Sequence, residues 1–202
     1  REALALIRDF STSVNGEGRI LELGAGTGYW ARLLRNEGVK ITPTDILPPR
    51  GKGMEVKMNG YHGCFAPWTH VQALSAKEAS SSSSNSNILM LVYPPPSNSM
   101  AVNALRGVDA DYIIYVGEFV GDTADKTFEN ALFHGYNCVK VHALPCWTNT
   151  ADRLSFWVKK GKPYGALETL RGGFTLTTPL ACAGCGVDLT IPLLGKGTDG
   201  KG

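Results

Sequence analysis

The sequence predicts an α/β protein: a doubly wound, mostly parallel sheet that ends in an antiparallel hairpin. Apolar runs typical of buried strands alternate with amphipathic segments along most of the 202 residues, which indicates βαβ crossovers and helices on both faces of a sheet. Two strand-like segments near the end of this pattern, 136–145 and 152–160, are joined by only six residues. Because that link is too short for a crossover helix, we expect these two strands to be antiparallel neighbours.

The first part of the chain reads as helix, strand, helix and strand. Apolar residues line one face of a helix over 1–10, and turn-forming residues in 11–18 are expected to end it. A short buried strand follows at 19–23, and then a helix over 29–38 that Gly38 ends. The next strand is 39–46, where Pro43 cannot donate a ladder hydrogen bond and therefore indicates an edge or a strand end.

The middle of the chain is less regular before the alternation returns. Residues 54–79 predict a strand or loop followed by a short helix over 71–79, and the serine-rich stretch 80–87 predicts a flexible surface insertion. The pattern then predicts a buried strand ended by three prolines (88–96), a capped helix (97–107), a strand (110–119) and a helix (123–135).

Composition limits the classes of partner. The formal net charge is +2, from 20 basic and 18 acidic residues, so nucleic acid is allowed as a partner but not indicated. No apolar stretch is long enough to span a bilayer, and we expect no membrane partner. Five scattered cysteines and no signal-like segment indicate free thiols in a reducing, cytoplasmic compartment. The sequence opens on Arg1 rather than Met, which indicates a trimmed chain whose earlier residues, and any targeting signal in them, are not seen.

The stretch "LELGAGTGYW" joins a predicted strand to a predicted helix through three glycines. Such a loop lets the backbone approach a ligand closely, with helix N–H groups directed at it. A Walker phosphate loop requires Gly-Lys-Ser/Thr, but Tyr29 and Trp30 follow Gly28. The dinucleotide fingerprint is Gly-x-Gly-x-x-Gly, and Tyr29 occupies the position of its third glycine. The spacing therefore disfavours a nicotinamide-dependent oxidoreductase.

With these flanks, the stretch resembles motif I of the class I, seven-β-strand S-adenosylmethionine-dependent methyltransferases. In that family a Rossmann-like, seven-stranded sheet ends in an antiparallel hairpin, and the resemblance extends over about residues 3–160. It implies a methyltransferase-like domain over 1–160, a C-terminal extension over 161–202, and S-adenosyl-L-methionine as cofactor. It also implies that the methionine end of the cofactor is surrounded by Glu22, Leu23, Gly24, Ala25, Gly26 and Gly28.

Asp45, at the end of the second predicted strand, is the second candidate anchor. A carboxylate there can accept hydrogen bonds from both ribose hydroxyls, and the resemblance implies that Ile46 lies against the adenine. Alternatively, Asp45 is an ordinary turn aspartate before "ILPP". The segment Trp68–His70 is a further candidate for contact with the adenine amine.

The stretch "VYPPPS", at the end of the strand over 88–96, resembles the Asp/Asn-Pro-Pro-Tyr/Phe tetrapeptide of amino-group methyltransferases. Tyr93 stands where the acid or amide is found in that tetrapeptide, and Pro96 stands where its aromatic residue is found. Tyr93 and Glu118 are the candidate catalytic residues, and Tyr93 and Pro94 are also expected to line the cofactor. As alternatives, the prolines simply terminate the strand and Glu118 is a solvated loop residue.

We therefore expect an S-adenosylmethionine-dependent methyltransferase with an unassigned acceptor: nucleic acid, protein or small molecule. The alternative is a non-catalytic methyltransferase-like binding module, which the departures in "VYPPPS" favour. The four histidines show no ligand spacing, and we expect no metal in the main domain. Cys182 and Cys185 in the extension form half of a zinc knuckle, or else a hairpin with two free thiols.

Overall fold

The computed structural model describes residues 1–15, 18–49, 60, 65–75, 78–79, 86–146 and 150–162. The serine-rich stretch lies largely outside these residues, as do Trp147 and the C-terminal extension with Cys182 and Cys185. In chain order the elements are α1 (Glu2–Asn15), β1 (Arg19–Leu23), α2 (Tyr29–Asn36), β2 (Lys40–Asp45), β3 (Gln72–Ala73), β4 (Ile88–Val92), α4 (Met100–Val108), β5 (Tyr112–Gly117), α5 (Lys126–Gly135), β6 (Tyr136–Ala143) and β7 (Arg153–Lys159).

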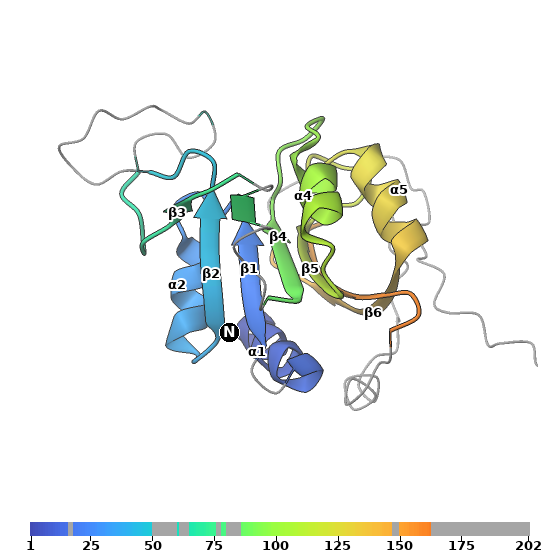
Figure 1. Ribbon diagram of the computed structural model, residues 1–202, viewed down its shortest axis with the longest axis horizontal. Coiled ribbons are helices and arrows are strands. Elements are labelled where there is room, and N and C mark those ends of the chain that lie inside the picture. Colours follow the sequence, from blue (N-terminus) through green and yellow to red (C-terminus); the bar gives the residue numbers. More distant parts are fainter. Residues whose placement is uncertain are drawn as a thin grey trace, which may run out of the picture.

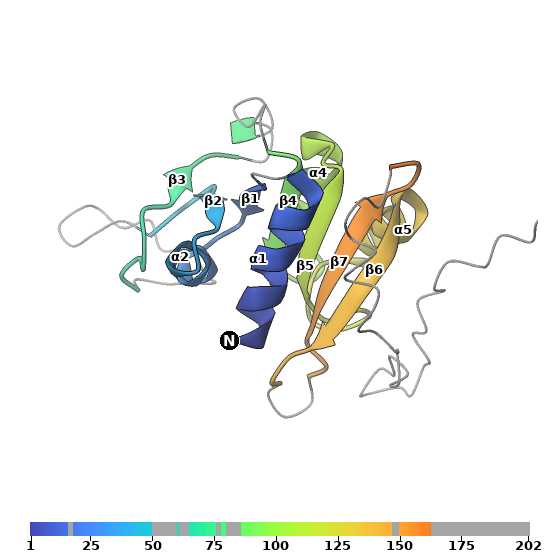
Figure 2. The same ribbon diagram turned by 90° about the horizontal axis from the view of Figure 1, so that it is seen from below.

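The strands form one seven-stranded sheet in the order β3-β2-β1-β4-β5-β7-β6 (Figures 1 and 2). The pairs from β3 to β5 are parallel, whereas β7 lies antiparallel to both β5 and β6. This arrangement confirms the predicted fold class, including the antiparallel hairpin and the seven strands that the resemblance implies. It also gives the sheet the shape in which open α/β proteins bind ligands, at the carboxyl ends of the strands where the strand order reverses.

Helices cover both faces of the sheet (Figures 1 and 2). Strand side chains alternate between two cores, as the period of a strand requires. On one face Ile20, Ile88 and Ile114 pack with residues of α1 and α2. On the other face Leu21 and Leu89 belong to the core with residues of α4 and α5. The strands are therefore apolar on both faces, which explains their nearly continuous apolar runs.

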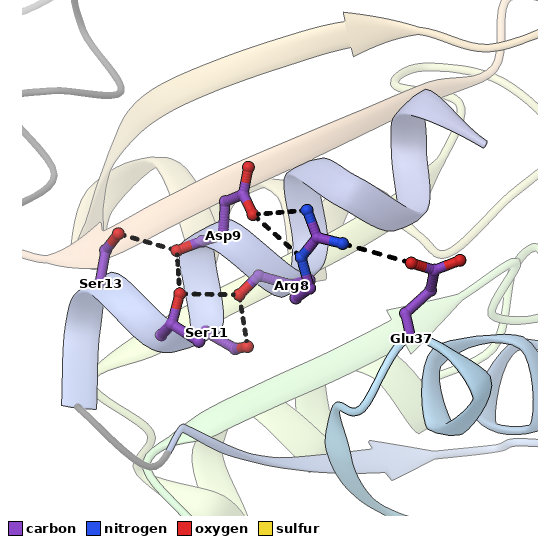
Figure 3. A network of polar contacts seen from close by, with 6 residues as sticks. Arg8, Asp9, Ser11, Ser13 and Glu37 are labelled. Carbon is purple, nitrogen blue, oxygen red and sulfur yellow. Dashed lines mark hydrogen bonds and ion pairs between the residues drawn. The ribbon is translucent and has the colours of Figure 1, made fainter.

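Helix α1 is longer than predicted, since it continues through the polar residues to Asn15. The hydroxyls of Ser11, Thr12 and Ser13 donate to carbonyls of the preceding turn, Ser11 Oγ to Arg8 O at 2.8 Å and Ser13 Oγ to the Asp9 carbonyl at 2.7 Å (Figure 3). These bonds keep the hydroxyls satisfied within the helix, so the turn-forming composition does not end it.

Arg8 links α1 to the end of α2. It donates to Glu37 at 3.3 Å and contacts Asp9 at 3.1 Å (Figure 3). All three side chains are exposed, so the free energy expected from these ion pairs is small. Burial of Ile7 and Phe10 therefore accounts for most of the attachment of α1 to the sheet.

The helix predicted over 71–79 is wrong at its start, because Gln72–Ala73 form strand β3. This short strand pairs in parallel with Thr44 and Asp45, and Leu74 N donates to Asp45 O at 3.0 Å. The backbone hydrogen bonds offered by the outer edge of β2 outweigh the weak helix propensity of so short a segment. Pro43 lies just before this pairing begins, where β2 has no partner strand on its outer side among the described residues.

No helix in the described part of the chain is both long and apolar enough to cross a membrane. The same residues contain no group of three or more His, Cys, Asp or Glu side chains that could hold a metal ion.

Candidate functional site

The glycine loop lies at the switch point of the sheet. The chain passes from β1 to β2 on one side, whereas β4 pairs with β1 on the other. Gly24, Gly26 and Gly28 have φ values of 72°, 53° and 74°, a region that residues with a Cβ rarely adopt. Ala25 N donates to Thr44 O at 2.9 Å, and Gly28 N donates to Ala25 O at 2.8 Å. The loop is thus a tight turn tied to β2.

Two of these glycines also lie close to neighbouring side chains. A Cβ on Gly24 would overlap the terminal methyl group of Met100 at the start of α4. A Cβ on Gly28 would lie 2.8 Å from a Thr69 methyl carbon and 2.9 Å from one of Val71. The loop is therefore enclosed by α4 on one side and by the segment before β3 on the other.

Asp45 fixes the loop from the end of β2. Its Oδ2 accepts from Gly26 N at 2.9 Å and its Oδ1 accepts from Leu47 N at 2.8 Å. A carboxylate offers about four lone-pair sites, so two acceptor positions are left for a ligand that carries hydroxyl groups. The sequence pointed to Asp45 as a ligand anchor, but not to its hydrogen bond with the loop itself.

Glu22 is a buried carboxyl next to this turn. It is 1% exposed, and its Oε2 has no hydrogen-bond partner among the described residues. Burial raises the pKa of Glu22 from 4.5 to about 8; nearby Arg35 opposes this rise and Asp45 adds to it. An acceptor held in this way suits a ligand that brings a cationic or N–H-donating group to it.

The other residues expected around the cofactor have different surroundings. Leu23 is buried in the core on the α4 and α5 side, so only its backbone faces the loop. Ile46 is 69% exposed just beyond Asp45. Trp68 N donates to Thr27 O at 2.8 Å, and the Trp68 ring lies 5.4 Å from that of Tyr29. The loop is thus flanked by exposed apolar side chains on its β2 and β3 side.

Tyr93 and Pro94 follow β4 directly. Tyr93 has a φ of 45° and its side chain is 45% exposed. Its N–H donates to Val116 O at 2.8 Å, and Pro94 O accepts from Ala124 N at the same distance. These bonds hold the turn against β5 and the loop before α5. Burial, with the charge of Asp152, raises the pKa of Tyr93 to about 12.

Asp152 is a site residue that sequence reasoning missed. It is 4% exposed, and its Oδ2 accepts from Thr150 Oγ1 at 3.0 Å. Its charge is one cause of the raised pKa of Tyr93. The available signal was its place immediately before the last strand: since β7 is antiparallel to β5, the start of β7 lies at the same edge of the sheet as the end of β4.

Glu118 connects two loops at this edge. Its Oε1 accepts from Ala151 N at 2.8 Å and its Oε2 accepts from Asp122 N at 3.2 Å. A Cβ on Gly121 would overlap the Glu118 side chain, so a larger residue there would displace it. Both oxygens are engaged in structural contacts, which is the arrangement of a residue that positions loops.

Cys146 and two of the histidines contact residues outside the glycine loop. Pro145 and Cys146 are exposed in the link before β7, and Cys146 Sγ donates to Leu144 O at 3.0 Å. His134 Nδ1 lies 2.7 Å from Asn130 O within α5, and His142 lies 3.9 Å from Glu2.

No model of a protein family matches the chain, and no curated protein matches its sequence. Among solved structures, the chain is similar to the N-methyltransferase NodS from Bradyrhizobium japonicum WM9, with 12% identity, coverage of 79% of this chain and 95% of that one, and a TM-score of 0.47. It is also similar to a protein of the NADB-Rossmann superfamily from Streptococcus agalactiae (12% identity, 86% and 75% coverage, TM-score 0.49). A third similar structure is the methyltransferase domain of bacterial CtHen1 (13% identity, 77% and 96% coverage, TM-score 0.49).

Proposed function

We propose that this protein is an S-adenosylmethionine-dependent methyltransferase. The observation that carries the proposal is the glycine loop set between two carboxyl groups at the switch point of the sheet. Glu22 presents an unpartnered oxygen among the described residues, and Asp45 holds the loop while keeping acceptor positions free. These groups match a ligand with an ammonium group at one end and a ribose diol at the other.

The same two carboxyl groups argue against a phosphate ligand at the loop. A pyrophosphate group would bring negative charge close to Asp45 and to Glu22, whose pKa is already raised by burial and by the charge of Asp45. A sulfonium cofactor with an ammonium group instead gains from both. The glycine spacing, which departs from the dinucleotide fingerprint, likewise disfavours a dinucleotide.

Each part of the chain has a defined task in this proposal. The glycines of the loop allow close approach of the backbone, Glu22 binds the ammonium group, and Asp45 binds the ribose hydroxyls. Tyr93 and Pro94 line the acceptor side at the end of β4. When bound, the cofactor supplies an electrophilic methyl carbon, to which the acceptor's lone pair bonds as the carbon–sulfur bond breaks and its electrons stay on sulfur. Position and exclusion of water then supply most of the rate.

Calorimetric titration with S-adenosylmethionine, S-adenosylhomocysteine and NADH tests the proposal. We expect binding of the first two ligands in about the micromolar range, as is typical of substrates, and none of NADH. Gly26→Arg should abolish binding by filling the loop. Gly38→Arg is the matched control, since Gly38 is another positive-φ glycine but has open space around it. Binding of NADH alone, or of none of the three, would contradict the proposal.

A second candidate function is a non-catalytic binding module with the same fold. The engagement of both Glu118 oxygens by backbone N–H groups favours it, because this leaves Glu118 poorly placed to act as a base. Such a module would bind S-adenosylhomocysteine, or nothing at this loop, without turning over S-adenosylmethionine. Measuring release of S-adenosylhomocysteine in the presence of amine, hydroxyl and RNA acceptors separates the two functions.

A further inference from the structure

An exposed aromatic surface lies where α2 begins. It consists of Tyr29, the first residue of α2, and of Phe65 and Trp68 in the segment before β3, with exposed fractions of 45%, 73% and 61%. The Tyr29 and Trp68 rings are 5.4 Å apart and meet edge to face, with 66° between their planes. Each of these two rings therefore keeps a face that the other does not cover. Exposed rings that gather in this way indicate a binding surface, whereas single exposed apolar residues do not.

Hydrogen bonds hold the aromatic surface in place without a ligand. The segment before β3 runs beside α2 (Figure 2), and Trp68 N donates to Thr27 O at 2.8 Å. The next residue, Thr69, accepts at its Oγ1 from Arg35 Nη1 at 2.6 Å, and Arg35 Nη2 donates to Ile41 O of β2 at 3.0 Å. A partner that binds to this surface would therefore order little of the protein, which lowers the cost of binding.

Arginines of α2 continue the aromatic surface. The helix packs its apolar face on the sheet and exposes Tyr29, Arg32 and Arg35. Arg32 lies three residues after Tyr29, so the two side chains are neighbours on the helix surface. Arg32 has no ion-pair partner in the part of the chain that the structure describes. Its guanidinium group is thus available to an anion that lies beside the Tyr29 ring.

Carboxylates are absent from the chain segments that form this surface. Residues 24–36 and 65–75 contain two arginines and no aspartate or glutamate. Glu37, which follows α2, is paired with Arg8 at 3.3 Å, and the two carboxyl groups beside the glycine loop are buried. The described part of the surface is therefore both aromatic and positively charged.

Single-stranded nucleic acid is the partner whose chemistry matches all of these features. Its bases have free faces that stack on aromatic rings, and its phosphates pair with arginine. In a duplex the base faces are already stacked on one another, so the rings would have no partner. An apolar protein surface would cover the rings but would leave the charge of Arg32 without a partner in a partly dry interface.

We propose that this surface binds single-stranded nucleic acid, with bases stacked on Trp68 and Tyr29 and a backbone phosphate on Arg32. The inference goes beyond the proposed function and does not depend on it, because the surface is formed without a cofactor. The local distribution of charge carries the inference, since the net charge of +2 does not by itself indicate nucleic acid.

Fluorescence anisotropy with a labelled, mixed-sequence RNA strand of about 16 nucleotides tests the proposal, since that length covers the usual site sizes. The measurement is made at about 50 mM salt without cofactor, and we expect a Kd in about the micromolar range. A DNA strand of the same sequence shows whether the sugar matters, and binding of either strand supports the proposal. An RNA duplex of the same sequence should bind about tenfold more weakly, because its bases are not free to stack.

Two exposed residues provide variants that should fold normally. Trp68→Ala should weaken binding of the single strand by about 5- to 100-fold, the range for loss of one stacked base, whereas Trp68→Phe should retain most of the affinity. Arg32→Ala should weaken binding and lower the slope of log K against log salt by about 0.7, as expected for one phosphate contact in a single strand. Arg106→Ala is the matched control, because Arg106 is an exposed arginine in the last turn of α4. It should change neither quantity.

The outcomes separate this inference from the proposed function. Failure of both strands to bind at micromolar protein overturns the inference, as does binding that Trp68→Ala and Arg32→Ala change no more than Arg106→Ala does. Equal binding of duplex and single strand overturns it as well, because stacking would then play no part. Self-association that Trp68→Ala removes, with no strand bound, would identify a protein interface instead. Titration with S-adenosylhomocysteine is scored separately: its failure overturns the proposed function alone, and Arg32→Ala should leave that affinity unchanged.

Discussion

Replacing Glu22 by glutamine should stabilise the free protein, by an amount that grows with pH. Glu22 is buried, has one oxygen without a partner among the described residues, and has a pKa raised by burial from 4.5 to about 8. Between these two pH values the folded protein holds a proton that the unfolded chain has released. Raising the pH through this range therefore favours unfolding.

The structure sets the size of this effect. The interval from 4.5 to about 8 spans about 3.5 pH units. At about 1.4 kcal/mol per unit the limit is roughly 5 kcal/mol, and we expect about 2 to 4 kcal/mol because the surroundings relax around a buried charge. Below pH 4.5 the carboxyl is neutral in both states, so the variant and the wild-type protein should then have similar free energies of unfolding. Above about pH 8 the difference should become constant.

Urea unfolding of wild-type protein and Glu22→Gln across about pH 5.5 to 9 measures the difference directly. Comparing the two proteins removes the contribution of other groups such as Glu129, whose pKa is also raised by burial. Glu37→Gln is the control, because that carboxyl is exposed and forms only a surface ion pair with Arg8. A difference between Glu22→Gln and wild-type protein that does not change with pH would refute the reasoning.

Three further changes test the loops around the site. Asp45→Asn should weaken binding of S-adenosylhomocysteine by roughly 1.5–3 kcal/mol, the range for hydrogen bonds to a charged group, and an unchanged affinity in calorimetry would remove the ribose assignment. Gly28→Ala should lower the free energy of unfolding by about 1–3 kcal/mol through its positive φ and the nearby Thr69 methyl group, whereas Gly135→Ala, with open space around it, should not. Gly121→Ala should be destabilising in wild-type protein and less so in Glu118→Ala, because the added methyl group displaces the Glu118 side chain; additive effects in this double-mutant cycle would argue against that contact.

Much of the fold follows from local patterns in the sequence. The apolar runs at 19–23, 88–92 and 112–117 are buried on both faces, and this is a pattern that sequence alone displays. The end of α1 and the identity of β3 were predicted wrongly for related reasons. Ser11–Ser13 satisfy their hydroxyls within the helix, and Gln72–Ala73 become a strand only because β2 offers an unpaired edge. Neither the hydrogen bonds of these hydroxyls nor the unpaired edge of β2 can be inferred from the composition of the segments themselves.

The candidate site also has one part whose proximity the sequence indicates and another part whose proximity it does not. Glu22, the glycines and Asp45 lie within one contiguous βαβ unit, so their spacing along the chain indicates their proximity. Asp152 is 59 residues from Tyr93 in the sequence, and the two lie at the same edge of the sheet only because β7 inserts between β5 and β6 in the antiparallel direction. The role of Glu118 depends in the same way on Ala151 in a distant loop. Contacts set by strand order could not be inferred before the order was known.

The raised pKa of Glu22 also predicts a proton count for cofactor binding, which connects the stability measurement to the proposed function. With a pKa of about 8, the carboxyl of the free protein is about nine-tenths protonated near pH 7. An ammonium group placed against its unpartnered oxygen favours the ionised form, so binding of S-adenosylhomocysteine should release close to one proton at that pH and almost none above about pH 9. Calorimetry in phosphate and in Tris, whose ionisation enthalpies differ strongly, gives this number from the slope of the apparent binding enthalpy. Glu22→Gln should remove the slope, whereas Glu37→Gln should leave it unchanged. Binding that releases no proton in the wild-type protein would mean that the ammonium group does not meet Glu22, even if the glycine loop holds the rest of the cofactor.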